Sequence, residues 1–285
     1  MKILITGSNG QLGNEIRELA SSYPHYHFQY TDVAELDIAD ATKVSQYFAS
    51  HNPDVIINCA AYTAVDKAET DKDLAYLVNA VAPGNLAFAA EQSGAFMVHV
   101  STDYVYSGKN YCPYSETDPT NPVSVYAKSK AAGEDAIKKS GTNALIIRTS
   151  WLYSAFGNNF IKTMMKYGAE RGKLNVVFDQ IGSPTYAHDL AKTILDILPT
   201  AMGANGSKIY HYSNEGVASW YDFAKAIIEI SGIECVINPI PTKDYPLPAE
   251  RPFYSVLDKA KIKKDFAIEI PYWRDSVKLC IQRLK

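Results

Sequence analysis

The chain has 285 residues, 47% of them hydrophobic, and a formal net charge of −3. This is the composition of an ordinary soluble globular protein, with no general attraction to nucleic acid or to an anionic membrane. We expect no membrane span, because no apolar run approaches the ~18 residues one requires, and no signal peptide. The four cysteines lie far apart in the sequence, which favours reduced thiols in a cytoplasmic protein over a disulfide framework or a zinc site.

A glycine-rich turn follows the first apolar run. Residues 2–6 predict a buried parallel strand, and Gly7, Gly10 and Gly13 follow it at three-residue spacing before a helical pattern begins. Gly10 would let the backbone approach a pyrophosphate, Gly13 would let the helix pack closely on the strand, and the helix N-terminus would offer free N–H groups. The stretch therefore predicts a dinucleotide site.

Acidic residues follow the second predicted strand, at residues 27–30. The carboxylate of Asp32 either accepts hydrogen bonds from the adenosine ribose, which would favour NAD, or belongs to a turn; both interpretations stay open. Asp37 and Ile38 suit the edge of an adenine pocket. Asp40 is a candidate cap for the next helix.

The middle of the chain continues to alternate strands and helices. Residues 54–59 and 96–100 predict two more buried strands, and residues 71–92 predict one long helix that stops at Gly94. The small residues that follow the strand at 54–59 would let the backbone approach a ligand at the carboxyl edge of the sheet.

Hydroxyl groups and a Tyr-x-x-x-Lys pair come next. Ser101 and Thr102 end a predicted strand, and because strand side chains alternate, only one of them points easily into a cleft. Tyr126 and Lys130 are four residues apart in a predicted helix, so both project from one face. An ammonium near a phenol lowers the pKa of the phenol, which suits acid catalysis.

The pattern becomes less regular after residue 150. We predict an α/β fold in which residues 1–150 form a Rossmann-type doubly wound parallel sheet and residues 151–285 form mainly a smaller α/β lobe that binds substrate. The later segments with element patterns are residues 159–171, 174–178, 186–198, 208–212 and 220–231. The strands near 174–178 and 208–212 are expected to complete the main sheet.

Together these features resemble the extended branch of the short-chain dehydrogenase/reductase superfamily, and in particular the dTDP-4-dehydrorhamnose reductase family. The resemblance covers roughly residues 2–284. It is carried by residues 10–13, 60–69, 101–106, 148–153, 157–160, 179–185 and 251–258.

The resemblance implies reduction of the C4 ketone of dTDP-4-dehydro-L-rhamnose to dTDP-L-rhamnose with NADPH or NADH, the last step in making this sugar donor for cell-surface polysaccharide. It implies that Tyr126 is the proton donor, that Lys130 holds the nicotinamide ribose, and that Thr102, not Ser101, binds the substrate oxygen. The implied cofactor contacts are Gly7, Gly10, Gln11, Leu12, Gly13, Asp32, Asp37, Ile38, Ala61, Tyr62, Thr63, Tyr126 and Lys130. The implied substrate contacts are Thr102, Asp103, Tyr104, Trp151, Asn159 and Arg251.

Two of these residues also have simpler interpretations: Asn159 could cap a helix, and Arg251 could pair with a structural carboxylate. Members of the family can form homodimers through a magnesium site that includes the position of Glu15. The region expected to supply its partners has His188-Asp189 in place of two acids, so the sequence does not favour a metal there.

Two other functions remain possible at this stage. A related nucleotide-sugar dehydratase carries Asp-Glu after the threonine, whereas this chain has Asp103-Tyr104, which argues against dehydration and, less strongly, against epimerisation. A non-catalytic binder, such as the regulatory subunit of methionine adenosyltransferase, would keep the fold without turnover.

Overall fold

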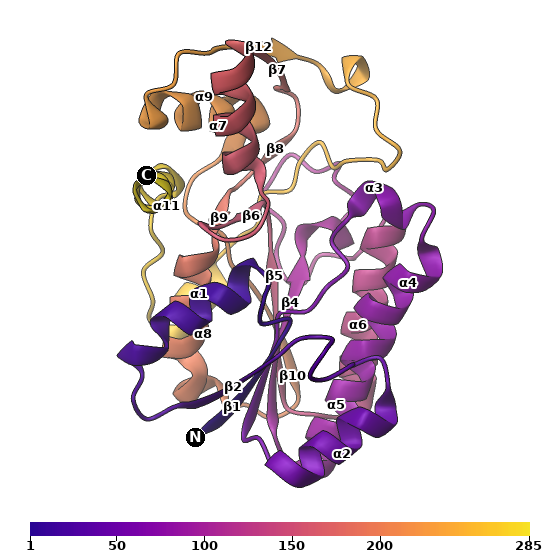
Figure 1. Cartoon of the computed structure of the whole chain (residues 1–285). Helices are drawn as coiled ribbons and strands as arrows, with labels where there is room; N and C mark the ends of the chain where they lie inside the picture. The colour runs from indigo at the N-terminus through magenta and orange to yellow at the C-terminus, as the bar shows by residue number, and fades with distance from the viewer.

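Six parallel strands form the central sheet, in the order β10-β5-β4-β3-β1-β2 (Figure 1). The computed structural model describes residues 1–285. The order reverses between β1 and β3, which makes this the doubly wound α/β sheet that the sequence predicts. The strands are β1 (Lys2–Thr6), β2 (His27–Thr31), β3 (Val55–Asn58), β4 (Phe96–Thr102), β5 (Ala144–Thr149) and β10 (Ser207–His211).

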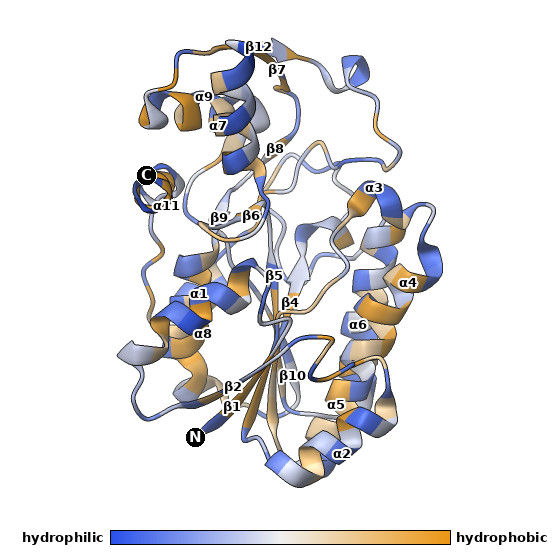
Figure 2. Ribbon diagram, viewed as in Figure 1, coloured by the Kyte–Doolittle hydropathy of each residue, from blue (hydrophilic) through white to orange (hydrophobic).

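Helices cover both faces of this sheet. Side chains of β1 alternate between two cores: Ile3 and Ile5 pack with α1 and α8, whereas Leu4 packs with α2, α5 and α6 on the other face. Strands buried on both faces must be apolar throughout, which explains their continuous hydrophobic runs (Figure 2). The helices are α1 (Gln11–Leu19), α2 (Ala41–His51), α5 (Ala82–Ser93), α6 (Val125–Ser140) and α8 (Ala187–Ala201), and none of them could cross a membrane.

The long helix expected at residues 71–92 has an interruption. It begins as α4 (Lys72–Tyr76), widens into a π-helical turn at Leu77–Val81 and continues as α5 to the left-handed Gly94. Pro83 cannot donate a backbone hydrogen bond and crowds the carbonyl four residues earlier, which is that of Asn79. The π turn accommodates this proline and places the buried side chain of Asn79 against α6, where it donates to Ser129 Oγ at 3.0 Å.

The second lobe has its own core around Phe223 (Figure 1, top). Helix α9 begins at a capping box in which Ser219 and Asp222 exchange hydrogen bonds. The elements of this lobe and its connections are β6 (Leu152–Tyr153), α7 (Phe160–Arg171), β7 (Lys173–Val177), β8 (Ile181–Gly182), β9 (Thr185–Tyr186), β11 (Ala218–Ser219), α9 (Trp220–Ser231), β12 (Val236–Ile240), α10 (Ala260–Phe266) and α11 (Trp273–Leu284). A short helix, α3 (Val65–Ala68), follows β3 in the first lobe.

One of the two strands expected to complete the sheet does so. The strand near 208–212 is β10, which pairs with β5 along five residues. The expectation for 174–178 is wrong: β7 pairs with β12 in a separate two-stranded sheet. Because β10 already occupies the edge beside β5, a strand leaving α7 has no place there.

A buried ion pair joins α6 to the sheet. Glu134 and Arg148 are each 2% exposed, and the guanidinium donates to both carboxylate oxygens, at 2.9 and 2.6 Å. Ser101 donates to the same carboxylate at 2.6 Å, and Arg148 also donates to Tyr106 Oη at 2.6 Å. This network fixes the rotation and height of α6, and therefore of the Tyr126–Lys130 pair on it.

Replacing Glu134 with Ala should lower the free energy of unfolding by about 3–5 kcal/mol, because it leaves the guanidinium of Arg148 buried without its partner. Urea denaturation measures this change. The matched control is Asp135→Ala on the next, exposed position of the same helix, which should change stability by less than about 0.5 kcal/mol. Equal effects of the two substitutions would show that the buried pair is not what holds α6.

Candidate active site

A cleft of about 480 Å³ opens at the carboxyl ends of β1, β3, β4 and β5, where the two lobes meet. This is the edge at which parallel α/β sheets bind ligands. Its lining includes Gly10, Gln11, Leu12, Ala61, Thr63, Ser101, Thr102, Asp103, Tyr104, Tyr126, Lys130, Trp151, Asn158 and Trp220. The structure thus brings together most of the predicted site residues from segments far apart in the sequence.

The glycine turn is pressed between β1 and β3. Gly7 has φ +65°, and a Cβ atom on it would lie 2.6 Å from the backbone of Ala60; a Cβ on Gly13 would lie 2.5 Å from Cα of Ser8. Gly10 precedes α1, and no side chain caps that helix N-terminus. The first N–H groups of α1 therefore remain available to an anion, which fits the pyrophosphate of a dinucleotide.

A second cavity of about 280 Å³ adjoins this turn and is lined by Asp32, Asp37 and Ile38, as expected for an adenosine site. Asp32 also ties the end of β2 to the turn, because its carboxylate accepts hydrogen bonds from the N–H groups of Asn9 (3.1 Å) and Val33 (2.9 Å). Asp32 is therefore a turn residue that also lines the cavity, and its hydrogen bond to an adenosine ribose stays a prediction.

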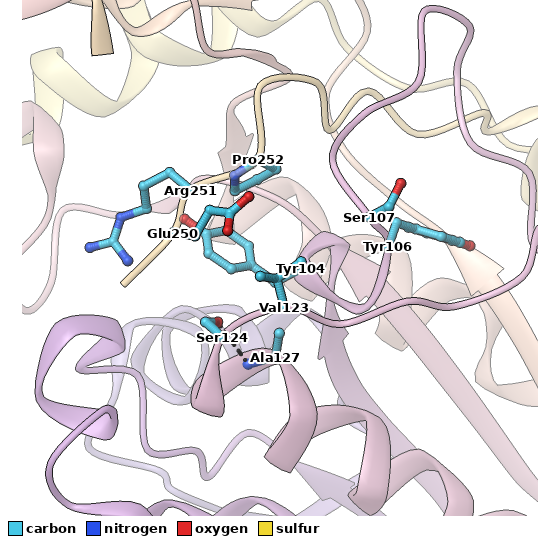
Figure 3. A pocket seen from close by; sticks show the side chains of 9 residues that line it. All are labelled: Tyr104, Tyr106, Ser107, Val123, Ser124, Ala127, Glu250, Arg251 and Pro252. Carbon is cyan, nitrogen blue, oxygen red and sulfur yellow. Dashed lines mark hydrogen bonds between the residues drawn. The ribbon is translucent and has the colours of Figure 1, made fainter. Parts of the chain in front are cut away.

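Helix α6 brings the phenol to the hydroxyl. Ser124 caps the helix by accepting a hydrogen bond from Ala127 N at 3.2 Å, which places Tyr126 in its first turn (Figure 3). Thr102 lines the same cleft as Tyr126 and lowers the pKa of its phenol in part, while the hydroxyl of Ser101 is bound by Glu134. The choice of Thr102 over Ser101 as the hydroxyl beside the phenol therefore agrees with the geometry.

The phenol of Tyr126 is not acidified in the way the sequence suggested. Burial raises the pKa of Tyr126 to about 12, the nearby hydroxyl of Thr102 lowers it only in part, and Asp103 raises it further. The ammonium of Lys130 does not offset this, because it donates to Val100 O at 2.7 Å and lies 3.4 Å from His99 Nε2. The expectation that Lys130 lowers this pKa is therefore wrong for this conformation, and Tyr126 is fully protonated at neutral pH.

Asp103 is a buried carboxyl group beside this pair. Its Oδ1 accepts a hydrogen bond from Thr102 at 2.9 Å, whereas Oδ2 is buried with no hydrogen-bond partner. Burial raises the pKa of Asp103 to about 7, although the nearby hydroxyls of Ser255 and Thr102 lower it in part. The unpartnered oxygen identifies Asp103 as a group that a polar ligand in the cleft could satisfy.

Two tryptophans line the same cleft as Tyr126. Trp151 and Trp220 are stacked, with ring centroids 3.7 Å apart and planes 11° apart. Trp151 has φ +49°, an uncommon conformation for a large residue that is typical of functional sites. A Cβ on Gly182 would lie 2.7 Å from the Trp151 ring, so only glycine leaves room for this stack. Aromatic faces of this kind suit a sugar ring.

An adjoining cavity of about 280 Å³ is lined by apolar side chains together with Tyr104 and Arg251. Figure 3 shows Tyr104 beside the loop that carries Glu250, Arg251 and Pro252, with the arginine turned away from Tyr106. Nη2 of Arg251 donates to Asp66 Oδ2 at 2.7 Å, whereas Nη1 is buried without a partner. Arg251 therefore pairs with a structural carboxylate and also keeps a free donor.

Three predicted contacts, Gly13, Tyr62 and Asn159, line neither the cleft nor the two adjoining cavities. The phenol of Tyr62 donates to Asp71 at 2.8 Å, and its backbone N–H donates to Asn79. Asn159 caps α7 by accepting from Lys162 N at 3.2 Å, and its neighbour Asn158 lines the cleft instead. Sequence reasoning missed Trp220, because its capping-box position says nothing about a stacking partner 69 residues earlier.

The residues around Glu15 do not fit a metal site. Its fully buried carboxylate accepts hydrogen bonds from Ser154 (2.5 Å) and Arg283 (2.8 Å) and contacts His188 Nδ1 at 3.1 Å. Burial alone would raise the pKa of Glu15, but these three partners lower it below its usual value. Asp189 is likewise engaged, by Asn214 and Ser276. The positive charge of Arg283 at the Glu15 carboxylate would repel a magnesium ion.

Asp103→Asn should stabilise the protein more at pH 8 than at pH 5. The raised pKa means that the folded state holds a proton between about pH 4 and pH 7 that the unfolded state has lost, so the free energy of unfolding falls as pH rises through this window. Thermal unfolding at both pH values measures the difference, with the exposed Asp135→Asn as control. A stabilisation that is equal at pH 5 and pH 8 would contradict the raised pKa.

Comparisons with known proteins identify the family to which the chain belongs. A model of the family described as the RmlD substrate binding domain matches residues 1–285. The dTDP-4-dehydrorhamnose reductase of Burkholderia thailandensis is 42% identical over 100% of this chain and 99% of its own, and the spore coat polysaccharide biosynthesis protein SpsK of Bacillus subtilis is 41% identical over 99% and 97%. The crystal structure of the Bacillus anthracis dTDP-4-dehydrorhamnose reductase in complex with NADP has a TM-score of 0.94 at 38% identity, over 99% of this chain and 98% of that one. The chain therefore belongs to the RmlD family, that of the dTDP-4-dehydrorhamnose reductases within the extended short-chain dehydrogenase/reductases.

Proposed function

We propose that this protein reduces the C4 ketone of dTDP-4-dehydro-L-rhamnose to the alcohol, with NADPH or NADH as the reductant. The observation that carries the proposal is the meeting of Thr102, Tyr126 and Lys130 in one cleft, between a dinucleotide-binding turn and a wall of stacked tryptophans. Each part has a use in ketone reduction: a proton donor, a donor to the carbonyl oxygen and a cofactor site.

The chain supplies binding, orientation and the proton. A bound nicotinamide would supply the hydride. Thr102 holds the ketone oxygen, and Tyr126, protonated in the resting site, gives its phenolic proton to that oxygen as negative charge develops on it. Lys130, four residues along the same face of α6, is placed to hold the ribose of the nicotinamide. The elevated pKa of Tyr126 suits an acid that must keep its proton until the substrate takes it.

Either cofactor suits the adenosine cavity. The relative from Bacillus anthracis was crystallised with NADP. In this chain Asp32 borders the place of the ribose, and a carboxylate there favours a free 2′-hydroxyl over a 2′-phosphate. We therefore propose that both NADH and NADPH are accepted, with the preference set near Asp32.

The free donor of Arg251 supports a role in binding the substrate diphosphate. Arg251 lines the apolar cavity that adjoins the cleft, which suits the nucleotide part of a sugar nucleotide, and its buried Nη1 has no hydrogen-bond partner. The other nitrogen is held by Asp66, so the guanidinium is already oriented. Every residue used here comes from one chain. The proposal therefore does not depend on the homodimer and the cytoplasmic location, which remain predictions.

Tyr104 argues against dehydration. A dehydratase of the related type needs a carboxylate base at this position, whereas burial raises the pKa of the Tyr104 phenol, so this side chain does not accept a proton as a carboxylate does. Tyr104 instead packs edge-on against Tyr126, with centroids 5.6 Å apart. The complete Thr102, Tyr126 and Lys130 set in turn favours catalysis over non-catalytic binding.

Tyr126→Phe should lower kcat for ketone reduction by about 10²–10⁴-fold, because it removes the proton donor. The dissociation constant for NADH or NADPH should stay within about threefold, since the ring and its packing are kept. Kinetics of cofactor oxidation and a fluorescence titration measure the two quantities.

Tyr111→Phe is the matched control, because Tyr111 is 89% exposed and remote from the cleft. It should leave both quantities unchanged. Full turnover in Tyr126→Phe would rule out the proposed proton donor, and loss of cofactor binding alone would assign the phenol a binding role.

A further inference from the structure

A buried polar chain lies beneath Lys130 and has no part in the chemistry described so far. It runs from Thr6 on β1 through Asn58 on β3 and His99 on β4 to Lys130 on α6, and each of these residues is at most 2% exposed. The successive atoms are 2.8 Å (Thr6 Oγ1 to Asn58 Oδ1), 3.0 Å (Asn58 Nδ2 to His99 Nδ1) and 3.4 Å (His99 Nε2 to Lys130 Nζ) apart. Four polar groups at the bottom of a catalytic cleft would be costly without a purpose.

The orientation of the Asn58 amide is fixed by a backbone donor. The N–H of Ala60 donates to Oδ1 at 3.1 Å, and the Thr6 hydroxyl donates to the same oxygen. A flipped amide would set its NH₂ against the N–H of Ala60, with two donors facing each other. Nδ2 therefore points at His99 and donates to its Nδ1.

This contact determines the tautomer of His99. Nδ1 must carry a lone pair to accept from Asn58, so the ring proton is on Nε2. Burial, reinforced by the charge of Lys130, holds the pKa of His99 well below its usual value, so the ring stays neutral. The Nε2–H group then faces the ammonium of Lys130 and cannot accept a hydrogen bond from it, which agrees with the long separation of 3.4 Å.

We propose that His99 is a positioning residue for Lys130. Asn58 locks His99 in the Nε2-protonated tautomer, which directs the free N–H groups of the lysine toward the cleft and weakens its hold on its proton. The ammonium keeps one inward bond, to Val100 O at 2.7 Å, and its other donors are left for the ribose of a dinucleotide and for Tyr126. The expected effect on turnover rests on the proposed function, whereas the expected tautomer of His99 does not.

The other charged groups near Lys130 act in known directions. On its own helix, Glu134 raises the pKa of Lys130, although Arg148 on β5 neutralises this carboxylate. Tyr126 on α6, Asp103 after β4 and Cys59 after β3 border the same cleft. Tyr126 and Cys59 are protonated at neutral pH, whereas Asp103, with a pKa of about 7, is about half ionised there. Burial dominates and lowers the pKa of Lys130 to about 8. The His99 ring is thus the nearby side chain whose tautomer decides whether the ammonium of Lys130 gains a further hydrogen-bond acceptor.

The direct test is the tautomer itself, measured by long-range ¹H–¹⁵N correlation of the histidine rings in the folded wild-type protein. His99→Phe identifies the signal by its disappearance. We expect an Nε2-protonated ring whose state does not change between pH 6 and pH 9. A proton on Nδ1 would overturn the proposal whether or not the enzyme reduces the expected ketone.

Two substitutions test the consequence through the pH dependence of kcat/KM. In Asn58→Asp the new carboxylate accepts a hydrogen bond from Nδ1 of His99, so the ring proton moves to Nδ1 and Nε2 becomes an acceptor for Lys130. The pKa on the alkaline side of the kcat/KM profile (the alkaline limb) should then rise by about one pH unit or more. The cofactor KM should increase several-fold, because one donor is drawn inward.

His99→Phe offers Lys130 no acceptor, just as the locked tautomer does not, so its alkaline limb should stay within about 0.3 pH units of wild type. If the pKa of the alkaline limb instead falls by about one unit in this variant, His99 normally stabilises the ammonium of Lys130, which contradicts the proposal. If either variant fails to fold, the tautomer of His99 in the wild-type protein still tests the proposal. A wild-type protein with the expected tautomer and no reductase activity would contradict the proposed function alone.

Discussion

The buried ion pair between Glu134 and Arg148 is the constraint on which the active site depends. It fixes α6 against β5, and Ser101, the neighbour of Thr102, is bonded to the same carboxylate. The helix is also pressed closely on the π turn, since a Cβ on Gly133 would lie 2.1 Å from Asn79 O. With its rotation and height set in this way, α6 has little freedom to move the phenol relative to the hydroxyl of Thr102.

Burial sets the acid–base character of the cleft. It raises the pKa of Tyr126 and of Asp103 and lowers that of Lys130, so that a phenol, a carboxylic acid and a lysine are shifted toward their neutral forms before any ligand enters. A bound dinucleotide and ketone bring charge and hydrogen-bonding groups into this environment. The site is therefore suited to respond to its ligands by moving protons, which is the task of a reductase that protonates an alkoxide.

Local sequence signals predicted the doubly wound sheet well. Strands buried on both faces and a glycine turn after β1 are visible as apolar runs and spacing, and the helix beginning after Asp40 is capped as expected. The pairing of β7 was mispredicted because strand partners are a tertiary property: Lys173–Val177 has a strand pattern, but nothing in that pattern says that β10 occupies the main edge and that β12 is its partner.

The candidate site was predictable where residues share a motif and unpredictable where they meet through the fold. Tyr126 and Lys130 follow from helical spacing, and the choice of Thr102 followed from family resemblance. The orientation of Lys130 toward Val100 and His99, the stack of Trp220 on Trp151 and the bond from Arg251 to Asp66 join segments that no local pattern connects. The enclosure of Glu15 by Arg283, 268 residues away, is the same kind of contact, and it removes a metal site that resemblance alone left open.

The most direct test of the central claim is oxidation of NADPH and NADH by the purified protein on addition of dTDP-4-dehydro-L-rhamnose, with the C4 configuration of the product determined. The account predicts stoichiometric cofactor oxidation with at least one of the two cofactors and formation of dTDP-L-rhamnose. No oxidation with either cofactor by folded protein that binds a dinucleotide, or a product with the opposite C4 configuration, would contradict it.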